Sequence, residues 1–487
     1  MSYKPENLSK RAAKGAAWGL ISNVTVSAIS FLSTAILARL LEPKDFGLFG
    51  MAMIVTGVVR LFGDFGLSAA LVHKKEIDNE YLSTAFWINV AAGLALAVVS
   101  IIVAPFASMF FKQPEVKWIL IWFSGTFILA GLSSVHKTLL YREIRMKHIA
   151  IIEIGCRIAR VIVILITAFL GFRFWSILIG VIVEGVLKTI AVIVSVNWRP
   201  NFIFCKKKFH ELFHFGRNLY LQSFLSYFTQ NMDFIITGKL LGAQMLGFYQ
   251  FSYNLPHLVK SYMQDSVGPV AFPVFCKVQD DNERLMRGFL KAVKCISIIT
   301  FPLMAGLFVC ADDFIVVVYS SKWLLSVEPL KILCLSAALA SVHTIMPSIF
   351  NSQGRPDIGL KWNLVKLPLT VVAIVIGGHI NGILGIAYAM FTIEVLSVAM
   401  PFIAVRLIKQ KFRTYVLALL PSIISSTVMV FLILLFRAFI ALPPGMNILR
   451  LALEFLVGVS TYSLIIIIVF KKDFEELMNF GAHIIKR

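Results

Sequence analysis

The chain has 487 residues, of which 58% are hydrophobic and only 15% are charged, and its mean hydropathy is +0.83. Soluble domains carry about 25% charged residues, so this composition excludes a large soluble domain and predicts a membrane protein with many spans. The net charge of +20 does not indicate nucleic-acid binding, because the basic residues are dispersed between hydrophobic stretches instead of being gathered on one domain.

The first hydrophobic stretch follows a basic N-terminus and runs to about Leu37 without an A-x-A-like cleavage site. We therefore expect it to remain as a membrane span and not to be removed as a signal peptide. At about 20 apolar residues per crossing, the sequence predicts an all-α protein with about fourteen transmembrane helices. They are expected near residues 15–38, 46–71, 82–106, 117–136, 149–170, 174–196, 216–237, 242–266, 290–310, 328–350, 358–378, 382–405, 414–438 and 448–470.

The distribution of Lys and Arg predicts the orientation of these spans. With both termini inside, the inner segments hold 31 of the 46 basic residues and the outer segments hold 9. This bias favours cytoplasmic termini and an even number of spans. A polar interruption near residues 197–215 is the expected hinge between two halves. The expected parts are an N-terminal six-helix lobe at 1–197, a cytoplasmic linker at 198–215, a C-terminal six-helix lobe at 216–410, and two extra helices with a cytoplasmic tail at 411–487.

A short pattern occurs twice, 200 residues apart. The corresponding segments are Arg39-Leu40-Leu41 and Lys239-Leu240-Leu241, Gly47-Leu48-Phe49 and Gly247-Phe248-Tyr249, and Val59-Arg60 and Val259-Lys260. Each copy is expected to be an outer helix end, a tight turn with glycine, and a hydrophobic helix that contains one cation. The period is too long for a solenoid repeat and is typical of the two halves of a transporter.

Six cations lie within the expected spans, where an isolated charge costs at least about 2.5 kcal/mol. They are Arg60, Arg157, Arg160, Lys188, Lys260 and Arg437. In one interpretation they form ion pairs within a helix or lie at helix ends, as the i,i+4 spacing of Glu184 and Lys188 and the terminal positions of Arg437 and Glu454 indicate. In the other interpretation they line a water-filled lumen that receives an anionic substrate group.

The second interpretation is favoured for Arg60 and Lys260, because the repeat places them equivalently, and it stays open for Arg157 and Arg160. Arg157 and Arg160 share one helix face with Glu153, and the planar guanidinium of arginine binds two phosphate oxygens at once. The sequence has no GxxxxGK[ST], HExxH or GxSxG motif, and its six cysteines form no CxxC or Cys/His cluster. We therefore expect no enzyme activity, cofactor, metal site or disulfide.

Three segments carry a resemblance to a known family: residues 37–78 (LARLLEPKDFGLFGMAMIVTGVVRLFGDFGLSAALVHKKEID), residues 268–285 (GPVAFPVFCKVQDDNERL), and the region of Lys361-Trp362-Asn363. The chain resembles polysaccharide exporters of the colanic-acid exporter type, which are flippases of the multidrug/oligosaccharidyl-lipid/polysaccharide (MOP) superfamily. The resemblance implies two six-helix lobes in a V around a central cavity, two extra helices, and alternating access. It also implies transport of undecaprenyl-diphosphate-linked oligosaccharide from the cytoplasmic to the outer leaflet of the bacterial cytoplasmic membrane.

On this basis we expect Arg60, Lys260, Arg157 and Arg160 to bind the diphosphate. Aromatic and amide side chains are expected to contact sugar: Tyr227, Gln230, Asn231, Tyr249, Tyr253 and Asn254. Asp64, Glu153 and Asp233 would couple an ion or, preferably, balance the cations. Membrane lipids are further expected partners, and the family implies a polysaccharide polymerase and a chain-length regulator.

Three alternatives remain open. A drug or cation antiporter of the same superfamily would need an acidic, cation-attracting cavity, whereas the repeated positions here are basic. A membrane glycosyltransferase or polymerase would usually need a sizeable extramembrane loop, and no loop here exceeds about 20 residues. A scaffold of an envelope assembly complex would tolerate loss of its intramembrane charges as far as stability permits.

Overall fold

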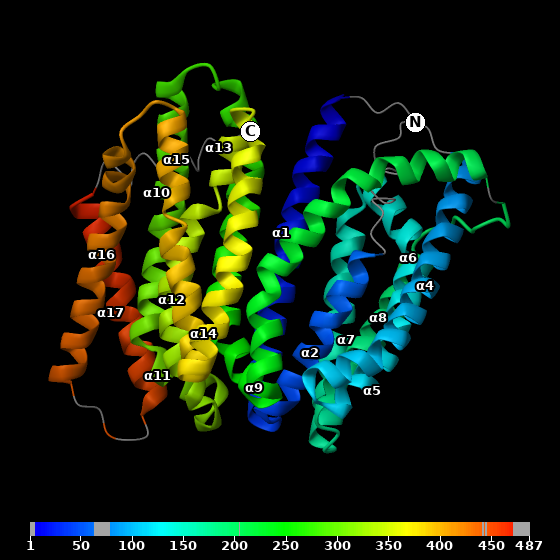
Figure 1. The fold of residues 1–487 in the computed structure, drawn as a ribbon, viewed down its shortest axis with the longest axis horizontal. Coiled ribbons are helices and arrows are strands. Elements are labelled where there is room, and N and C mark those ends of the chain that lie inside the picture. The colour runs from blue at the N-terminus through cyan, green and yellow to red at the C-terminus, as the bar shows by residue number, and fades with distance from the viewer. Residues whose placement is uncertain (1–4, 63–77, 204, 441–442, 444–445, 471–487) are drawn as a thin grey trace. The chain divides into compact units, whose positions relative to one another are not determined.

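The computed structural model describes residues 5–62, 78–203, 205–440, 443 and 446–470, and these residues form helices without any strand. The chain divides into two compact units, Met1–Gly247 and Phe248–Arg487. Figure 1 shows the course of the chain and the helix labels used below. The structure confirms the predicted all-α membrane class.

The first unit contains helices that pack closely on one another. They are α1 (Pro5–Leu40), α2 (Pro43–Leu61), α4 (Asn79–Phe111), α5 (Pro114–Phe123), α6 (Gly125–Arg142), α7 (Met146–Phe169) and α8 (Phe174–Val194). Its largest core includes Leu48, Met51, Ile119 and Leu120. Helices α4 and α6 approach closely because Gly93 faces the Phe127 carbonyl and Gly131 faces the Asn89 carbonyl.

The long helix α9 (Lys206–Lys277) contributes to both units and is broken at Gly242, whose φ of 82° suits glycine. The remaining helices belong to the second unit. They are α10 (Asn282–Val309), α11 (Ala311–Phe314), a π-helix (Ile315–Tyr319), a 3₁₀-helix (Ser321–Ser326), α12 (Val327–His343), α13 (Met346–Ser352), α14 (Pro356–Leu396), α15 (Ala399–Leu407), α16 (Phe412–Phe439) and α17 (Asn447–Ile468). Helix α14 is broken at Asn381 and Gly382 and is therefore two helices in series.

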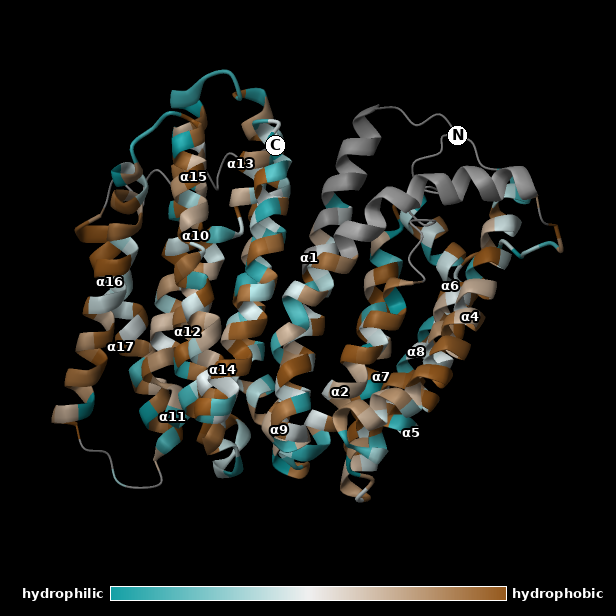
Figure 2. Cartoon of the chain, viewed as in Figure 1, coloured by the Kyte–Doolittle hydropathy of each residue, from teal (hydrophilic) through white to brown (hydrophobic). Residues whose placement is uncertain are grey.

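Nine stretches of the described residues are helical, long and apolar enough to cross a membrane. One of them, Pro356–Leu407, covers two of the expected spans because it continues across the break in α14. Helices α2, α7 and α9 are not among the nine, and residues 63–77 are outside the described part, so the number fourteen stays a prediction. Figure 2 shows long hydrophobic stretches along α4, α16 and α17, as expected for surfaces that face lipid.

The repeated glycines lie at two equivalent backbone contacts. A Cβ atom at Gly47 would overlap the carbonyl oxygen of Ala243, and one at Gly247 would overlap that of Pro43. Positions 43 and 243, like 47 and 247, are separated by the repeat offset of 200 residues. The repeat therefore brings its two copies together in a reciprocal contact, and glycine is required where each backbone meets the other.

Candidate functional site

A cluster of charged side chains connects the two antiparallel helices α7 and α8, which lie side by side (Figure 1). The turn between them contains Gly171, whose φ is 84°. Arg160 Nη1 donates a hydrogen bond of 2.9 Å to Glu184 Oε2, nearer the turn. Farther from the turn, Lys188 Nζ donates a hydrogen bond of 3.1 Å to Glu153 Oε1.

These pairs correct one of the two interpretations drawn from the sequence. The i,i+4 spacing of Glu184 and Lys188 suggested a pair within one helix, but each residue pairs with the facing helix instead. The reason is that both helices present their charges to the same interface, where the partner's charge is available and lipid is excluded. The shared face predicted for Glu153, Arg157 and Arg160 is the face that packs on α8.

The α7–α8 cluster contains more cations than carboxylates. Lys137 of α6 lies 3.6 Å from Glu153, and Arg157 Nη2 lies 3.4 Å from Glu184 Oε1. Four cations therefore surround two carboxylates. Arg157 makes no hydrogen bond within the described part of the chain, and its buried Nε has no partner there. Since a guanidinium has five N–H donors, Arg157 keeps most of its capacity to bind an anion.

The second unit holds a comparable cluster across the break in α14. Lys366 Nζ, before the break, donates a hydrogen bond of 2.8 Å to Glu394 Oε1, after it. His343 Nδ1 of α12 lies 3.3 Å from Glu394 Oε2. In both units, a hairpin of helices thus pairs a cation in its first helix with a carboxylate in its second.

Lys260 and Glu394 line one small cavity of about 40 Å³, together with Tyr253 and His257. A cavity of this size holds two or three water molecules, if each needs roughly 15 Å³. The rings of Tyr253 and His257 stack with their centroids 5.0 Å apart. Lys366 was not predicted as a site residue, because it counts among the basic residues of the inner segments. The signal that could have identified it is Glu394, a single carboxylate in an apolar span, which needs a cation nearby.

The other predicted diphosphate ligand, Arg60, is exposed in the last turn of α2 and makes no ion pair or hydrogen bond with a described residue. Its partner expected from the sequence, Asp64, lies outside the described residues. Nearby, Tyr227 donates a 2.6 Å hydrogen bond to the Ile54 carbonyl and packs against Gly57. This contact joins α2 to the first part of α9.

The remaining predicted site residues differ in exposure. Gln230 and Asn254 are exposed, whereas Asn231 donates a 2.9 Å hydrogen bond to the Tyr227 carbonyl. Tyr249 is fully buried, and Asp233 is 2% exposed. The structure thus brings Glu153, Arg157 and Arg160 into one cluster and Lys260 and Tyr253 into another.

No group of three His, Cys, Asp or Glu side chains among the described residues is placed to hold a metal ion. The six cysteines are free thiols.

Long apolar helices that pair cations with carboxylates at their interfaces define an integral membrane protein. A model of the family described as "Polysaccharide biosynthesis protein" matches residues 36–328, which is more than half of the chain. The protein therefore belongs to this polysaccharide biosynthesis family, and the predicted resemblance is confirmed.

Two curated relatives agree with this assignment. The chain is 26% identical over 428 residues to the lipopolysaccharide biosynthesis protein WzxC of Escherichia coli K12, covering 86% of each chain. It is 22% identical over 369 residues to the succinoglycan biosynthesis transport protein ExoT of Rhizobium meliloti, covering 76% of this chain and 75% of ExoT.

Solved structures with low sequence identity share the fold. The lipid II flippase MurJ in its inward closed conformation matches with a TM-score of 0.73 and 16% identity, covering 94% of this chain and 99% of MurJ. An inward-facing multidrug resistance MATE transporter of the MOP superfamily matches with a TM-score of 0.63 and 13% identity, covering 79% of this chain and 96% of the transporter. The protein therefore has the fold of MOP transporters, as predicted.

Proposed function

We propose that the protein is a flippase that moves undecaprenyl-diphosphate-linked oligosaccharide from the cytoplasmic to the outer leaflet for surface polysaccharide synthesis. It would act as a transporter in the bacterial cytoplasmic membrane, with both termini in the cytoplasm. Membership of the polysaccharide biosynthesis family and similarity to a named transport protein support the class. The excess of cations over carboxylates in the α7–α8 cluster is the observation that supports an anionic substrate.

The physical problem of such a flippase is the diphosphate, whose charge cannot enter hydrocarbon without compensation. Arg157 would provide the first contact, because it lacks a hydrogen bond in the described structure and has buried donors. Arg160 would hold the cluster in place through Glu184, and Glu153 would balance the remaining charge. In the second unit, Lys260 and Lys366 would receive the same group beside Glu394.

The sugar would meet polar and aromatic groups that retain exposed surface, namely Tyr227, Gln230, Asn231, Tyr253 and Asn254. Alternating access would then expose the cationic clusters to either side of the membrane in turn. We further propose that Arg60 attracts the diphosphate at the end of α2, where it is exposed. A polymerase and a chain-length regulator would use the transported repeat unit.

The antiporter alternative is less well supported by the same geometry. A transporter of cationic drugs needs accessible carboxylates, whereas four cations surround the two carboxylates of the α7–α8 cluster, and Lys366 and Lys260 lie around the single carboxylate of Glu394. Glu394 and Glu184 each face at least two cationic or ionisable basic groups.

The test is to deplete the protein in its host and to determine on which leaflet the lipid-linked repeat unit lies. We expect it to accumulate facing the cytoplasm while surface polymer falls. Restoring the wild-type gene or Arg287→Gln, an exposed arginine of α10, should restore polymer, whereas Arg157→Gln should not. A repeat unit that still reaches the outer leaflet unpolymerised would mean a polymerase or scaffold, and an unchanged repeat unit with raised drug sensitivity would mean an antiporter.

A further inference from the structure

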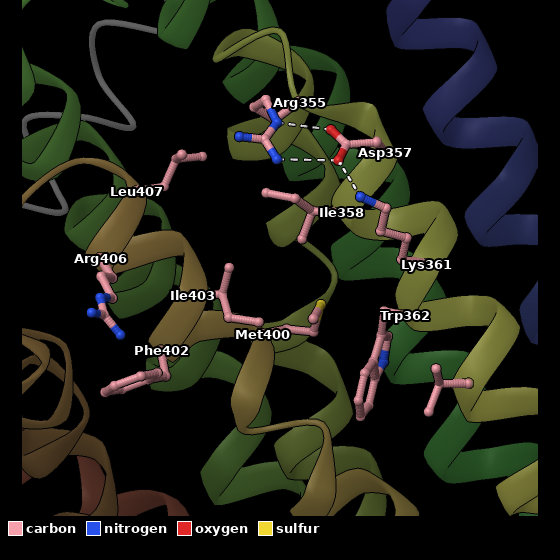
Figure 3. A pocket seen from close by; sticks show the side chains of 11 residues that line it. Arg355, Asp357, Ile358, Lys361, Trp362, Met400, Phe402, Ile403, Arg406 and Leu407 are labelled. Atoms are coloured by element: carbon pink, nitrogen blue, oxygen red, sulfur yellow. Dashed lines mark hydrogen bonds and ion pairs between the residues drawn. The ribbon is translucent and has the colours of Figure 1, made fainter.

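A separate pocket of about 600 Å³ opens in the second unit, where the start of α14 faces α15 (Figure 3). Its interior is apolar. The lining consists of Ile358, Trp362, Val365, Met400, Phe402, Ile403 and Leu407, together with the charged residues Arg355, Asp357, Lys361 and Arg406. It contains none of the residues assigned to the charged clusters above, and it is far larger than the 40 Å³ cavity beside Lys260.

Only some of the charged residues of the pocket have a hydrogen-bonding partner. Asp357 accepts hydrogen bonds of 2.9 and 3.2 Å from Arg355 and one of 3.1 Å from Lys361. Arg406, on the other side of the pocket in Figure 3, is exposed and has no partner in the described part of the chain. Three cations against one carboxylate leave the pocket with an excess of positive charge, and Arg406 has all its donors available.

Apolar side chains of the pocket wall are exposed at the surface of α14 and α15. Val365 and Phe402 line the pocket and are 51% and 47% exposed, and Leu364, next to Val365 in α14, is 56% exposed. Trp362, half-buried in the wall, is a residue type that anchors helices at the membrane interface. The excess of Lys and Arg assigns this end of α14 to the cytoplasmic leaflet.

From this combination we infer that the pocket binds an anionic phospholipid of the cytoplasmic leaflet. Its phosphodiester accepts hydrogen bonds from Arg406 and Lys361, and its acyl chains lie on Phe402, Val365 and the apolar face of α14. The single negative charge of a phosphodiester suits these exposed cations, of which two are already paired with Asp357. A diphosphate would be bound better by several half-buried cations, as around Arg157. The inference does not depend on what the protein transports.

The experiment uses the purified full-length protein and compares phosphatidylglycerol with phosphatidylcholine of the same acyl chains by native mass spectrometry. We expect the wild-type protein to retain more phosphatidylglycerol than phosphatidylcholine. Arg406→Gln should weaken that binding about fivefold, the factor expected for one cation at an anionic lipid surface. Because the exposed side chain of Arg406 makes no hydrogen bond or ion pair with a described residue, this variant should fold normally.

Arg413→Gln is the matched control, since Arg413 is also exposed at the same end of the second unit but does not line the pocket. A second variant, Lys361→Gln, should reduce phosphatidylglycerol binding while Arg355 keeps Asp357 paired. Equal retention of both lipids by the wild type, or equal effects of Arg406→Gln and Arg413→Gln, would overturn the inference. So would binding of a prenyl phosphate that phosphatidylglycerol does not displace, because the pocket would then belong to a prenyl lipid.

Discussion

Arg157 and Arg160 are one helical turn apart and contact the same carboxylate, but their contacts differ. Arg160 makes a 2.9 Å hydrogen bond to Glu184, whereas Arg157 makes only a 3.4 Å ion pair. Glu184 therefore holds Arg160 more firmly than it holds Arg157. The unused N–H donors of Arg157 are the reason why we propose that this residue binds the substrate.

This difference leads to a prediction that separates the two arginines. Arg160→Gln should lower the free energy of unfolding by about 2 kcal/mol, the contribution of a hydrogen bond between charged groups. Arg157→Gln should change stability less but reduce transport by about tenfold or more, since a charge-assisted contact to phosphate is lost. Thermal unfolding in detergent and complementation of polymer export measure the two effects, with Arg287→Gln as control. Equal losses of stability and transport in both variants would contradict the division of roles.

At the scale of helices, the two repeated glycines lie so close to another backbone segment that no larger residue fits at either position. Gly47→Ala and Gly247→Ala should each destabilise the protein by about 1–3 kcal/mol, because a methyl group would overlap a backbone carbonyl that cannot rotate away. Gly155→Ala on α7 is the control, since no atom lies within 4 Å of the added methyl. Melting temperatures in detergent check this, and a neutral Gly47→Ala would argue against the reciprocal contact.

The last two helices are joined to the rest of the second unit by an ion cluster. Arg437 of α16 donates hydrogen bonds of 2.6 and 2.9 Å to Glu454 of α17 and one of 3.0 Å to Asp313 of α11. The sequence predicts that Arg437 and Glu454, near helix ends, hold the helices together through ion pairs. The structure places this pairing between three helices and not within one, and Glu454 is fully buried.

We therefore predict that Arg437→Met lowers stability by about 3 kcal/mol, because a buried carboxylate loses its partner. The double variant Arg437→Met/Glu454→Leu should recover much of this loss, since the fully buried carboxylate is removed and Asp313 remains 3.7 Å from Arg450. Limited proteolysis between α16 and α17, together with thermal unfolding, reports the effect, and Arg413→Gln on the same helix is the control. A single variant as stable as the wild type would show that the cluster contributes nothing.

At the scale of the whole molecule, the distribution of Lys and Arg predicts that both termini lie in the cytoplasm. A green fluorescent protein fused to either end should fluoresce, because it folds in the cytoplasm. Alkaline phosphatase inserted after Ile440, between α16 and α17, should be active, because that connection is expected to lie outside. Fluorescence at only one terminus would mean an odd number of spans and would remove the basis for placing the start of α14 in the cytoplasmic leaflet.

The sequence alone determined the class of this protein, its family and its repeat. These properties follow from composition, from the length of apolar stretches and from motifs, all of which are local along the chain. Because helical periodicity relates residues three or four apart, it also predicted correctly that Glu153, Arg157 and Arg160 share a face.

Only the tertiary structure decided which charges meet. Lys188 is paired with Glu153, and Lys366 with Glu394, across a turn or a break in a helix, 35 and 28 residues apart. Such pairs depend on the geometry of the hairpin and on which helix faces pack together. Periodicity within one helix predicts neither of these. The pocket around Arg406 was hidden for the same reason, since its walls come from the start of α14 and from α15, on either side of the break at Asn381 and Gly382.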